Sequence, residues 1–213
     1  MIEPVVHIVD DDASFLTAAS RLLRASGFAV RTHASAQEFL DARNDDSPGC
    51  VVADLRMPGL DGLALQAALG RTCHPLPLLF LTGQGDIAST VRAMRGGAED
   101  FLEKTAPRDE LLDAVRRALA RDLREREARQ RLESLRARFA TFTPRELEVM
   151  GHVVRGRLNK QIAGDLGIGE RTVKVHRKSL MDKLGVRSVA ALTRLTQEAG
   201  VPLAEKEEFP KVQ

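Results

Sequence analysis

Val51-Val52-Ala53-Asp54-Leu55-Arg56-Met57-Pro58-Gly59 is the stretch that indicates the fold, because an apolar run typical of a buried strand ends in a carboxylate and passes into loop residues. A second apolar run, residues 5–9, ends in three aspartates, Asp10, Asp11 and Asp12, and Lys104 follows a third run. Residues just past the carboxyl ends of parallel strands converge on one crevice, so we expect these groups to meet. Clustered carboxylates repel one another unless a cation lies among them. Oxygen ligands suit Mg²⁺, and Mg²⁺ beside a lysine is what phosphoryl transfer to a carboxylate requires.

Short apolar runs alternate with longer amphipathic runs through the first part of the chain. The apolar runs predict strands over residues 5–9, 29–32, 50–53, 76–81 and 98–102. The amphipathic runs predict helices over residues 15–26, 36–42, 61–69 and 87–95, and from 107 onward. Such alternation is typical of a parallel sheet with helices on both faces, so we expect an α/β domain over residues 1–120.

The chain has 213 residues, enough for one domain of about 120 residues and a smaller second one. No apolar run approaches the roughly 20 residues of a membrane span, and the first residues lack the pattern of a signal peptide. We therefore expect a cytoplasmic protein without a membrane partner. Cys50 and Cys73 lack the spacing of a metal cage, and we interpret both as small, buried apolar residues.

The net charge of +2 conceals a division along the chain. Residues 1–118 hold 12 Lys and Arg against 17 Asp and Glu, whereas residues 141–203 hold 11 against 6. An acidic first part suits a metal or phosphate site. A basic second part suits a polyanionic partner such as nucleic acid.

Residues 121–140 are predicted to form a helical linker. An acidic residue precedes a basic one by four positions at 122/126, 125/129 and 127/131. Such pairs stabilise a solvent-exposed helix by about 0.2–0.5 kcal/mol each. We interpret the segment as a long solvated helix. A thin dimer seam is the alternative, formed by Leu119, Leu123, Leu132 and Leu135. Their spacing is broken between 123 and 132, which argues against a coiled coil.

A second, all-α domain is predicted over residues 141–203, with residues 204–213 as a flexible tail. Thr143, Pro144 and Glu146 have the spacing of a capping box, so a helix begins at 144 and ends before Gly156. Further helices are expected over residues 159–166 and 170–184. Two helices joined by a glycine-bearing turn, here residues 167–169, are typical of a helix-turn-helix.

The helix over residues 170–184 has an apolar face and a cationic face. Val173, Leu180 and Leu184 share the apolar face, and the cationic residues are Arg171, Lys174, Arg177 and Lys178. A recognition helix inserts its first turns into the major groove of DNA, where Lys and Arg reach guanine or phosphate. By charge alone, a merely solvated cationic face is an equally good interpretation.

Four motifs in residues 1–120 resemble the receiver domain of bacterial two-component response regulators, which has a flavodoxin-like, five-stranded parallel sheet. They are Val9-Asp10-Asp11, Asp54-Leu-Arg-Met-Pro-Gly-Leu-Asp-Gly62, Leu81-Thr82-Gly83 and Asp100-Phe-Leu-Glu-Lys104. The resemblance implies that Asp54 accepts a phosphoryl group. It also implies that Asp10, Asp11, Asp54 and the main-chain carbonyl of Arg56 hold Mg²⁺, for which Mn²⁺ can substitute.

The same resemblance implies that Lys104 contacts a phosphoryl oxygen, that Thr82 turns its hydroxyl toward the phosphoryl group and that Phe101 rotates inward behind it. One residue departs from the family pattern. Receivers usually have Lys-Pro at the fifth loop, often with a cis peptide, whereas here Thr105 follows Lys104. Because a cis bond without proline costs about 3–4 kcal/mol, this departure predicts a trans bond and a less firmly held Lys104.

Residues 141 to about 200 closely resemble a LuxR-type helix-turn-helix. The motifs are Thr143-Pro-Arg-Glu-Leu-Glu-Val149, Asn159-Lys-Gln-Ile-Ala163, Thr172-Val-Lys-Val-His176 and Lys183-Leu-Gly-Val186. The resemblance implies contacts to base edges from Lys174, Val175 and Lys178. It implies contacts to the DNA backbone from Lys160, Arg171, Thr172 and Arg177. It also implies a helix over residues 188–195 that packs the small core and offers a dimer surface.

The whole chain thus resembles response regulators of the FixJ/NarL type. This implies a transcriptional regulator rather than an enzyme, with a sensor histidine kinase, double-stranded promoter DNA and RNA polymerase as partners, and a homodimer formed on phosphorylation. Two other interpretations stay open. The receiver could be degenerate on a DNA-binding protein that needs no phosphorylation, or the chain could be a phosphoryl sink that interacts with a kinase.

Overall fold

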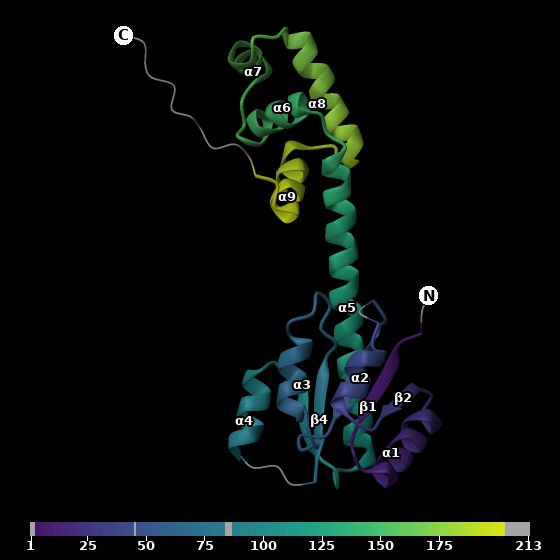
Figure 1. Cartoon of the computed structure of the whole chain (residues 1–213). Coiled ribbons are helices and arrows are strands. Elements are labelled where there is room, and N and C mark those ends of the chain that lie inside the picture. The colour runs from purple at the N-terminus through teal and green to yellow at the C-terminus, as the bar shows by residue number, and fades with distance from the viewer. Residues whose placement is uncertain (1–2, 45, 84–86, 203–213) are drawn as a thin grey trace. The chain divides into compact units, whose positions relative to one another are not determined.

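The computed structural model describes residues 3–44, 46–83 and 87–202. The chain divides into two compact units, residues 1–126 and 127–213, which are described separately below. The first unit is a parallel sheet with helices on both faces, and the second is entirely helical within its described residues (Figure 1). The fold class predicted from the sequence is therefore confirmed. The tail expected over residues 204–213 lies outside the described residues.

The sheet of the first unit has five parallel strands in the order β2-β1-β3-β4-β5. The strands are β1 (Val5–Val9), β2 (Ala29–His33), β3 (Gly49–Ala53), β4 (Leu78–Thr82) and β5 (Asp100–Glu103). Every residue of β3 and β4 is buried, because both strands lie inside the sheet and helices cover both of its faces.

Two strands begin later than predicted. Strand β4 begins at Leu78 rather than at residue 76, because Pro77 has no N–H to donate to the ladder. Strand β5 begins at Asp100 rather than at residue 98, because the N–H of Ala98 still bonds to the carbonyl of Ala93 at the end of the preceding helix. The other strand boundaries differ from the prediction by one residue at most.

The helices of the first unit are α1 (Ala13–Ala25), α2 (Ala36–Ala42), α3 (Gly62–Leu69), α4 (Ile87–Arg95) and the first part of α5 (Arg108–Ala140). Helix α1 begins two residues earlier than predicted, because the Asp12 side chain caps it by accepting from the N–H groups of Ser14 and Phe15. The side chain of Asp61 caps α3 in the same way. Both aspartates therefore act as helix caps.

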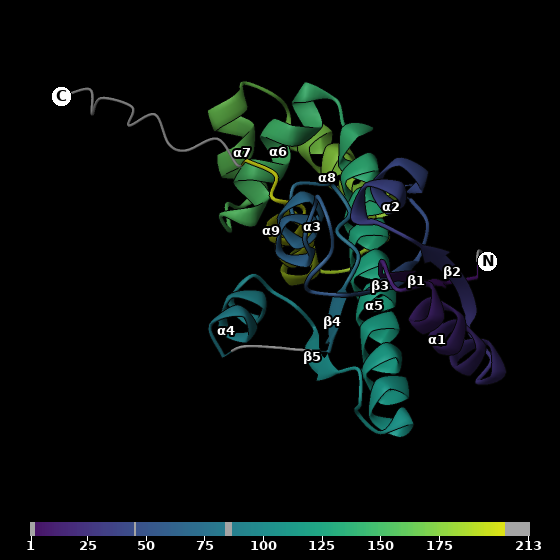
Figure 2. The same cartoon turned by 60° about the horizontal axis from the view of Figure 1, so that its bottom comes forward.

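Each face of the sheet has its own core. Helices α1 and α5 cover one face, and α2, α3 and α4 cover the other (Figure 2). Because successive strand residues point to opposite faces, Ile8 enters the first core and Val9 the second. Cys50 is buried in the first core, as expected. Cys73 is exposed, so its interpretation as a buried residue was wrong.

Most residues of α5 over 121–140 are exposed or half-buried, but the predicted pair at 122/126 is not a surface pair. Asp122 is 2% exposed, and it accepts from the main-chain N–H of Gly49 at 3.0 Å and from Arg126 at 2.8 Å. Arg126 also donates to the carbonyls of Asp46 and Ser47. The pair of Asp122 and Arg126 is thus buried, and it binds the main chain of the loop before β3, which fixes α5 to the first unit. We call this pair the α5 clamp.

The leucines of α5 do not form a common seam. Leu119 packs against the first core and Leu135 is buried in the core of the second unit, whereas Leu123 is 58% exposed. The expected pairing of Glu125 with Arg129 is replaced by a bond from Arg121 to Glu125. Among the described contacts of α5, Leu119 and Leu135 therefore pack inside the cores of the two units, and not on one shared face of the helix.

The second unit packs the end of α5 against α6 (Pro144–Val154), α7 (Asn159–Leu166), α8 (Glu170–Leu184) and α9 (Val189–Ala199). The capping box of Thr143 and Glu146 is formed as predicted. Helix α9 continues four residues past its predicted end, to Ala199, and Gly200, whose φ is positive, ends it. Met150, Ile162, Leu180 and Leu192 are fully buried in the core.

No helix among the described residues is both long enough and apolar enough to cross a membrane.

Candidate functional site

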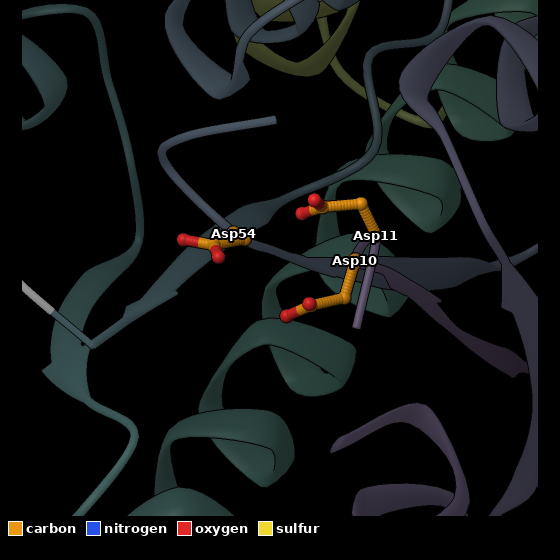
Figure 3. Close-up of side chains that lie close together, drawn as sticks. All are labelled: Asp10, Asp11 and Asp54. Atoms are coloured by element: carbon orange, nitrogen blue, oxygen red, sulfur yellow. The ribbon is translucent and has the colours of Figure 1, made fainter. Parts of the chain in front are cut away.

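Three aspartates meet at the carboxyl ends of β1 and β3. The ladder pairs Val9 with Ala53, so Asp10 and Asp54 leave neighbouring strands at the same level. Asp10 is 1% exposed and Asp54 is 8% exposed, whereas Asp11 is exposed. One carboxylate oxygen from each of the three lies within 4.8 Å of the others (Figure 3). Two buried hard ligands and one exposed one, with room for water, match the way proteins bind Mg²⁺.

Lys104 reaches this cluster from the loop after β5. Its Nζ lies 2.7 Å from Asp10 Oδ2 and 2.8 Å from Asp54 Oδ2. Its main-chain N–H donates to the carbonyl of Thr82, which fixes the loop beside the end of β4. The peptide bond to Thr105 is trans, since the described residues contain no cis bond. Lys104 keeps both carboxylate partners all the same.

The charges of Lys104 and Asp10 are coupled. Burial raises the pKa of Asp10, although its bond to Lys104 acts in the opposite direction. Burial by itself would lower the pKa of Lys104, but its bonds to Asp10 and Asp54 outweigh that effect and the pKa is raised. The ammonium thus compensates part of the negative charge at the site.

The loop after Asp54 is held close to helix α3. The N–H of Arg56 donates to Asp54 Oδ1 at 3.3 Å, so the main chain of Arg56 lies at the site. The N–H of Gly62 donates to the carbonyl of Leu55. A Cβ at position 62 would lie 2.4 Å from the carbonyl oxygen of Asp54, so only glycine lets the first turn of α3 approach this closely.

Thr82 and Phe101 lie on the two neighbouring strands β4 and β5. Thr82 ends β4 and is 1% exposed, and the ladder pairs it with Glu103, next to Lys104. Phe101 is half-buried, and its ring centroid lies 6.0 Å from that of Phe80. The structure thus brings Thr82 beside the end of β5, next to Lys104, and Phe101 lies on β5 three residues before Lys104.

Phe15 is a residue of this site that sequence reasoning missed. The Lys104 ammonium lies 4.5 Å from the centroid of the Phe15 ring, a distance typical of a cation–π contact. In the sequence, Phe15 is only one of the apolar residues of an amphipathic helix. Its position three residues after Asp12 was the one available signal.

Helix α8 presents most of the predicted DNA-contacting residues to solvent. Val173, Leu180 and Leu184 are buried, as predicted. The predicted contacts on α8 that are exposed are Arg171, Thr172, Lys174, Val175 and Lys178. Lys160 is also exposed, in the first turn of α7. An exposed helix face with three or more cations and one apolar residue, Val175, can contact both phosphates and base edges.

Arg177 differs from the other predicted contacts. It is half-buried and donates to the side-chain oxygen of Asn159 at 2.8 Å. This bond joins α8 to the first residue of α7. Its guanidinium keeps four further N–H donors, so it can still contact a phosphate while it is held by Asn159.

A buried carboxylate holds α8 against α6. Glu146 is 4% exposed and accepts from Ser179 at 2.6 Å, from Lys183 at 2.7 Å and from the N–H of Thr143 at 2.8 Å. The bonds from Lys183, Ser179 and Thr143 lower the pKa of Glu146 to about 2. The carboxylate therefore stays charged and fixes the second half of α8.

Comparison with known proteins assigns both parts of the chain. Residues 6–116 match the family model described as response regulator receiver domain, and residues 140–196 match bacterial regulatory proteins of the luxR family. Nodulation protein W of Bradyrhizobium diazoefficiens is 44% identical over 197 residues, which cover 92% of this chain and 87% of that protein. The transcriptional regulatory protein FixJ of the same organism is 38% identical and is covered to 96% of its length, over 92% of this chain. The solved structure of the response regulator StyR is 44% identical and superposes with a TM-score of 0.85, covering 92% of this chain and 99% of StyR.

Proposed function

The chain belongs to the response regulators that join a receiver domain to a LuxR-type DNA-binding domain, and we propose that phosphorylation of its Asp54 controls its binding to DNA. Its domains and relatives make it a transcriptional regulator of a two-component system. The observation that carries the proposal is the position of Asp54, whose Oδ2 lies 2.8 Å from Lys104 Nζ beside Asp10 and Asp11.

Each residue of the acidic site has a role in the proposed reaction. An oxygen of Asp54 bonds to phosphorus while the bond from phosphorus to the donor breaks, and the leaving group of the donor takes up a proton. Asp10, Asp11, Asp54 and the carbonyl of Arg56 would hold Mg²⁺ or Mn²⁺. When bound, this cation supplies positive charge to the transferring phosphoryl group. Lys104 neutralises a phosphoryl oxygen from the other side. Self-phosphorylation and its reversal at Asp54 would be the only chemistry of the chain.

The phosphoryl group is proposed to act on Thr82 and Phe101. It brings about −1.5 to −2 charges and new acceptor oxygens next to the end of β4. The hydroxyl of Thr82 can donate to one of these oxygens. Movement of Thr82 then makes room for Phe101, which is only half-buried. The surface formed by α4 and β5 changes as a result. A local change in packing beside Asp54 would thus alter a more distant surface.

Homodimerisation is proposed to follow. Three large apolar residues of α4 are exposed and recur with helical spacing, Ile87 (86%), Val91 (41%) and Met94 (44%). An exposed apolar stripe of this kind is typical of an interaction surface. Two recognition helices in a dimer could contact half-sites one helical turn apart.

DNA contacts are assigned by position on α8 and α7. We propose that Lys174, Val175 and Lys178 contact base edges, because they are exposed on the outer face of α8. Lys160, Arg171, Thr172 and Arg177 are proposed to contact the DNA backbone. The further partners are a sensor histidine kinase as the phosphoryl donor and RNA polymerase at the promoter, and the proposed location is the cytoplasm.

Mass spectrometry of the full chain tests the acceptor. Incubation with Mg²⁺ and acetyl phosphate should add one phosphoryl group to the wild-type chain and none to Asp54→Asn. Asp61→Asn is a matched control, because Asp61 is a nearby carboxylate that caps α3 and Asn caps equally well. This control should be labelled like the wild type, and chelation of Mg²⁺ should abolish labelling. Labelling of Asp54→Asn would refute the assignment. An unlabelled wild type would favour a degenerate receiver.

A further inference from the structure

Lys104 has three partners at the acidic site, and two of them take part in the proposed chemistry. The carboxylates of Asp10 and Asp54 lie 2.7 and 2.8 Å from its Nζ, and the ring centroid of Phe15 lies 4.5 Å away. We propose that Phe15 is a positioning residue, which holds the Lys104 ammonium at the phosphoryl site through the whole phosphorylation cycle. This inference rests on the proposed function of Asp54 as acceptor.

The main chain of Phe15 is joined to the acidic cluster by hydrogen bonds. Asp10 Oδ1 accepts from the N–H of Asp12 at 2.9 Å, and Asp12 Oδ1 accepts from the N–H of Phe15 at 3.2 Å. The ring then contacts Lys104, whose ammonium returns to Asp10 Oδ2. Asp10, Asp12, Phe15 and Lys104 thus form a closed ring of four contacts. Phe15 therefore has a defined place relative to the carboxylates, although it lies on α1.

The carboxylates of Asp10 and Asp54 do not bind the Lys104 ammonium equally well at every stage of the phosphorylation cycle. A cation bound by Asp10 and Asp54 competes with the ammonium for their oxygens. Phosphorylation then converts Asp54 to a mixed anhydride, which loses its carboxylate charge. The face of the Phe15 ring is unchanged by both events, and its attraction for a cation grows when water is excluded. Lys104 is 19% exposed by its side chain, so water is already largely excluded there.

Phe15 also lines a mainly apolar cleft, of which Lys104 forms part of the wall. The cleft has a volume of about 200 Å³ and is lined by apolar side chains of α1 and α5, such as Leu22 and Leu111, and by Lys104 and Glu103. Glu103 is exposed and offers a competing carboxylate. Without the ring, the long side chain of Lys104 could leave the phosphoryl site and pair with Glu103. The ring thus keeps the Lys104 ammonium beside Asp10 and Asp54 and away from Glu103.

The test compares four full-length chains, wild type, Phe15→Leu, Phe15→Tyr and Leu22→Ala. The rate constant for phosphorylation by acetyl phosphate and the affinity for fluoroberyllate are measured with Mg²⁺, together with Mg²⁺ affinity alone by calorimetry. Phe15→Leu should lower the rate constant and the fluoroberyllate affinity about fivefold, the size expected for loss of a partly desolvated cation–π contact. Its Mg²⁺ affinity should not fall, because a less firmly held Lys104 competes less for the oxygens of Asp10 and Asp54. Phe15→Tyr keeps the ring and should restore both values.

Leu22→Ala is the control for packing. It removes an apolar side chain from the same cleft without touching Lys104, so it should lower thermal stability and leave the rate constant unchanged. A ring-current shift of the Lys104 ε-methylene protons would support the contact independently. NMR should show this shift in every chain that keeps an aromatic ring at position 15, and not in Phe15→Leu.

Three results would overturn the inference. Phe15→Leu could be phosphorylated as fast as the wild type. Its Mg²⁺ affinity could fall as much as its rate constant, which would mean that the whole site is distorted. Leu22→Ala could be slowed equally. Failure of the proposed function has a different signature, because the wild-type chain would then take up no phosphoryl group at all.

Discussion

At the scale of single residues, the acidic site is a balance of charges. Asp10, Asp11 and Asp54 bring three carboxylates within 4.8 Å, and one ammonium, that of Lys104, binds two of them. The same oxygens would hold a divalent cation. Lys104 and the cation are therefore partial competitors before phosphorylation, and partners once a phosphoryl group brings additional negative charge.

This competition predicts the behaviour of Lys104→Met. Removal of the ammonium leaves the buried Asp10 without its ionic partner, so we expect the free energy of unfolding of the first unit to fall by about 1–3 kcal/mol without Mg²⁺. Mg²⁺ should then stabilise Lys104→Met more than the wild type, because the negative charge is no longer compensated. Calorimetry with and without Mg²⁺ measures both effects, and Lys160→Met is the control in the other unit. Equal stabilisation of the variant and the wild type would contradict the charge balance.

Glu146 predicts a pH dependence for the second unit. Its pKa is lowered from 4.5 to about 2 by bonds from Lys183, Ser179 and Thr143. A carboxyl group whose pKa is lower in the folded state contributes stability above its unfolded pKa. That contribution is lost as the pH falls from about 4.5 toward 2. We expect Glu146→Gln to cost about 1–3 kcal/mol at pH 7, and less as the pH falls through this window.

Thermal unfolding of the full chain, followed at pH 7 and at lower pH, measures the effect of Glu146→Gln. Glu148→Gln is the matched control on the same helix, because Glu148 is half-exposed and pairs only with Arg145 among the described contacts. That variant should cost less than about 0.5 kcal/mol. A loss from Glu146→Gln that did not depend on pH would show that the charge of Glu146 is unimportant.

At the scale of elements, the sequence predicted what depends on periodicity and on local capping. The strands appeared as apolar runs, and Thr143 marked the first turn of α6 because its side chain bonds to a nearby N–H group. The meeting of Asp10, Asp54 and Lys104 was also predictable, since the ends of parallel strands converge.

Other contacts could not be predicted because they depend on tertiary packing. The partner of Phe15 is nearly ninety positions away along the chain, and an apolar residue on an amphipathic helix carries no sign of a cation partner. Asp122 has the spacing of an ordinary surface pair with Arg126. Only the folded structure shows the main chain of Gly49 beside it, which makes the pair a buried clamp. Glu146 was predicted as a cap but not as an acceptor for Ser179 and Lys183.

The α5 clamp leads to a prediction at this scale. Asp122→Ala leaves Arg126 without its carboxylate and the N–H of Gly49 without an acceptor, so it should destabilise the first unit by about 2–4 kcal/mol. Asp113→Ala on the same helix is the control, because Asp113 is 60% exposed and pairs with Arg116 at the surface. It should cost less than about 1 kcal/mol. Urea unfolding followed by circular dichroism distinguishes the two variants, and equal losses would contradict the clamp.

At the scale of the whole molecule, the chain combines an acidic receiver with a basic DNA-binding domain. The proposed phosphoryl group on Asp54 would change charge and packing at one site, whereas the proposed DNA contacts lie on α7 and α8 in the other unit. Coupling between them requires that phosphorylation favour the state that binds DNA, through a dimer or through release of the DNA-binding domain. Both routes predict tighter DNA binding on phosphorylation.

The most direct measurement is the DNA affinity of the phosphorylated and unphosphorylated chain at one salt concentration. A duplex selected from a random pool with the fluoroberyllate-treated wild type serves as the probe. We predict that acetyl phosphate with Mg²⁺ raises the affinity of the wild type at least about tenfold and leaves Asp54→Asn unchanged. The same affinity for the wild type with and without a phosphoryl group on Asp54 would contradict control of DNA binding by this residue.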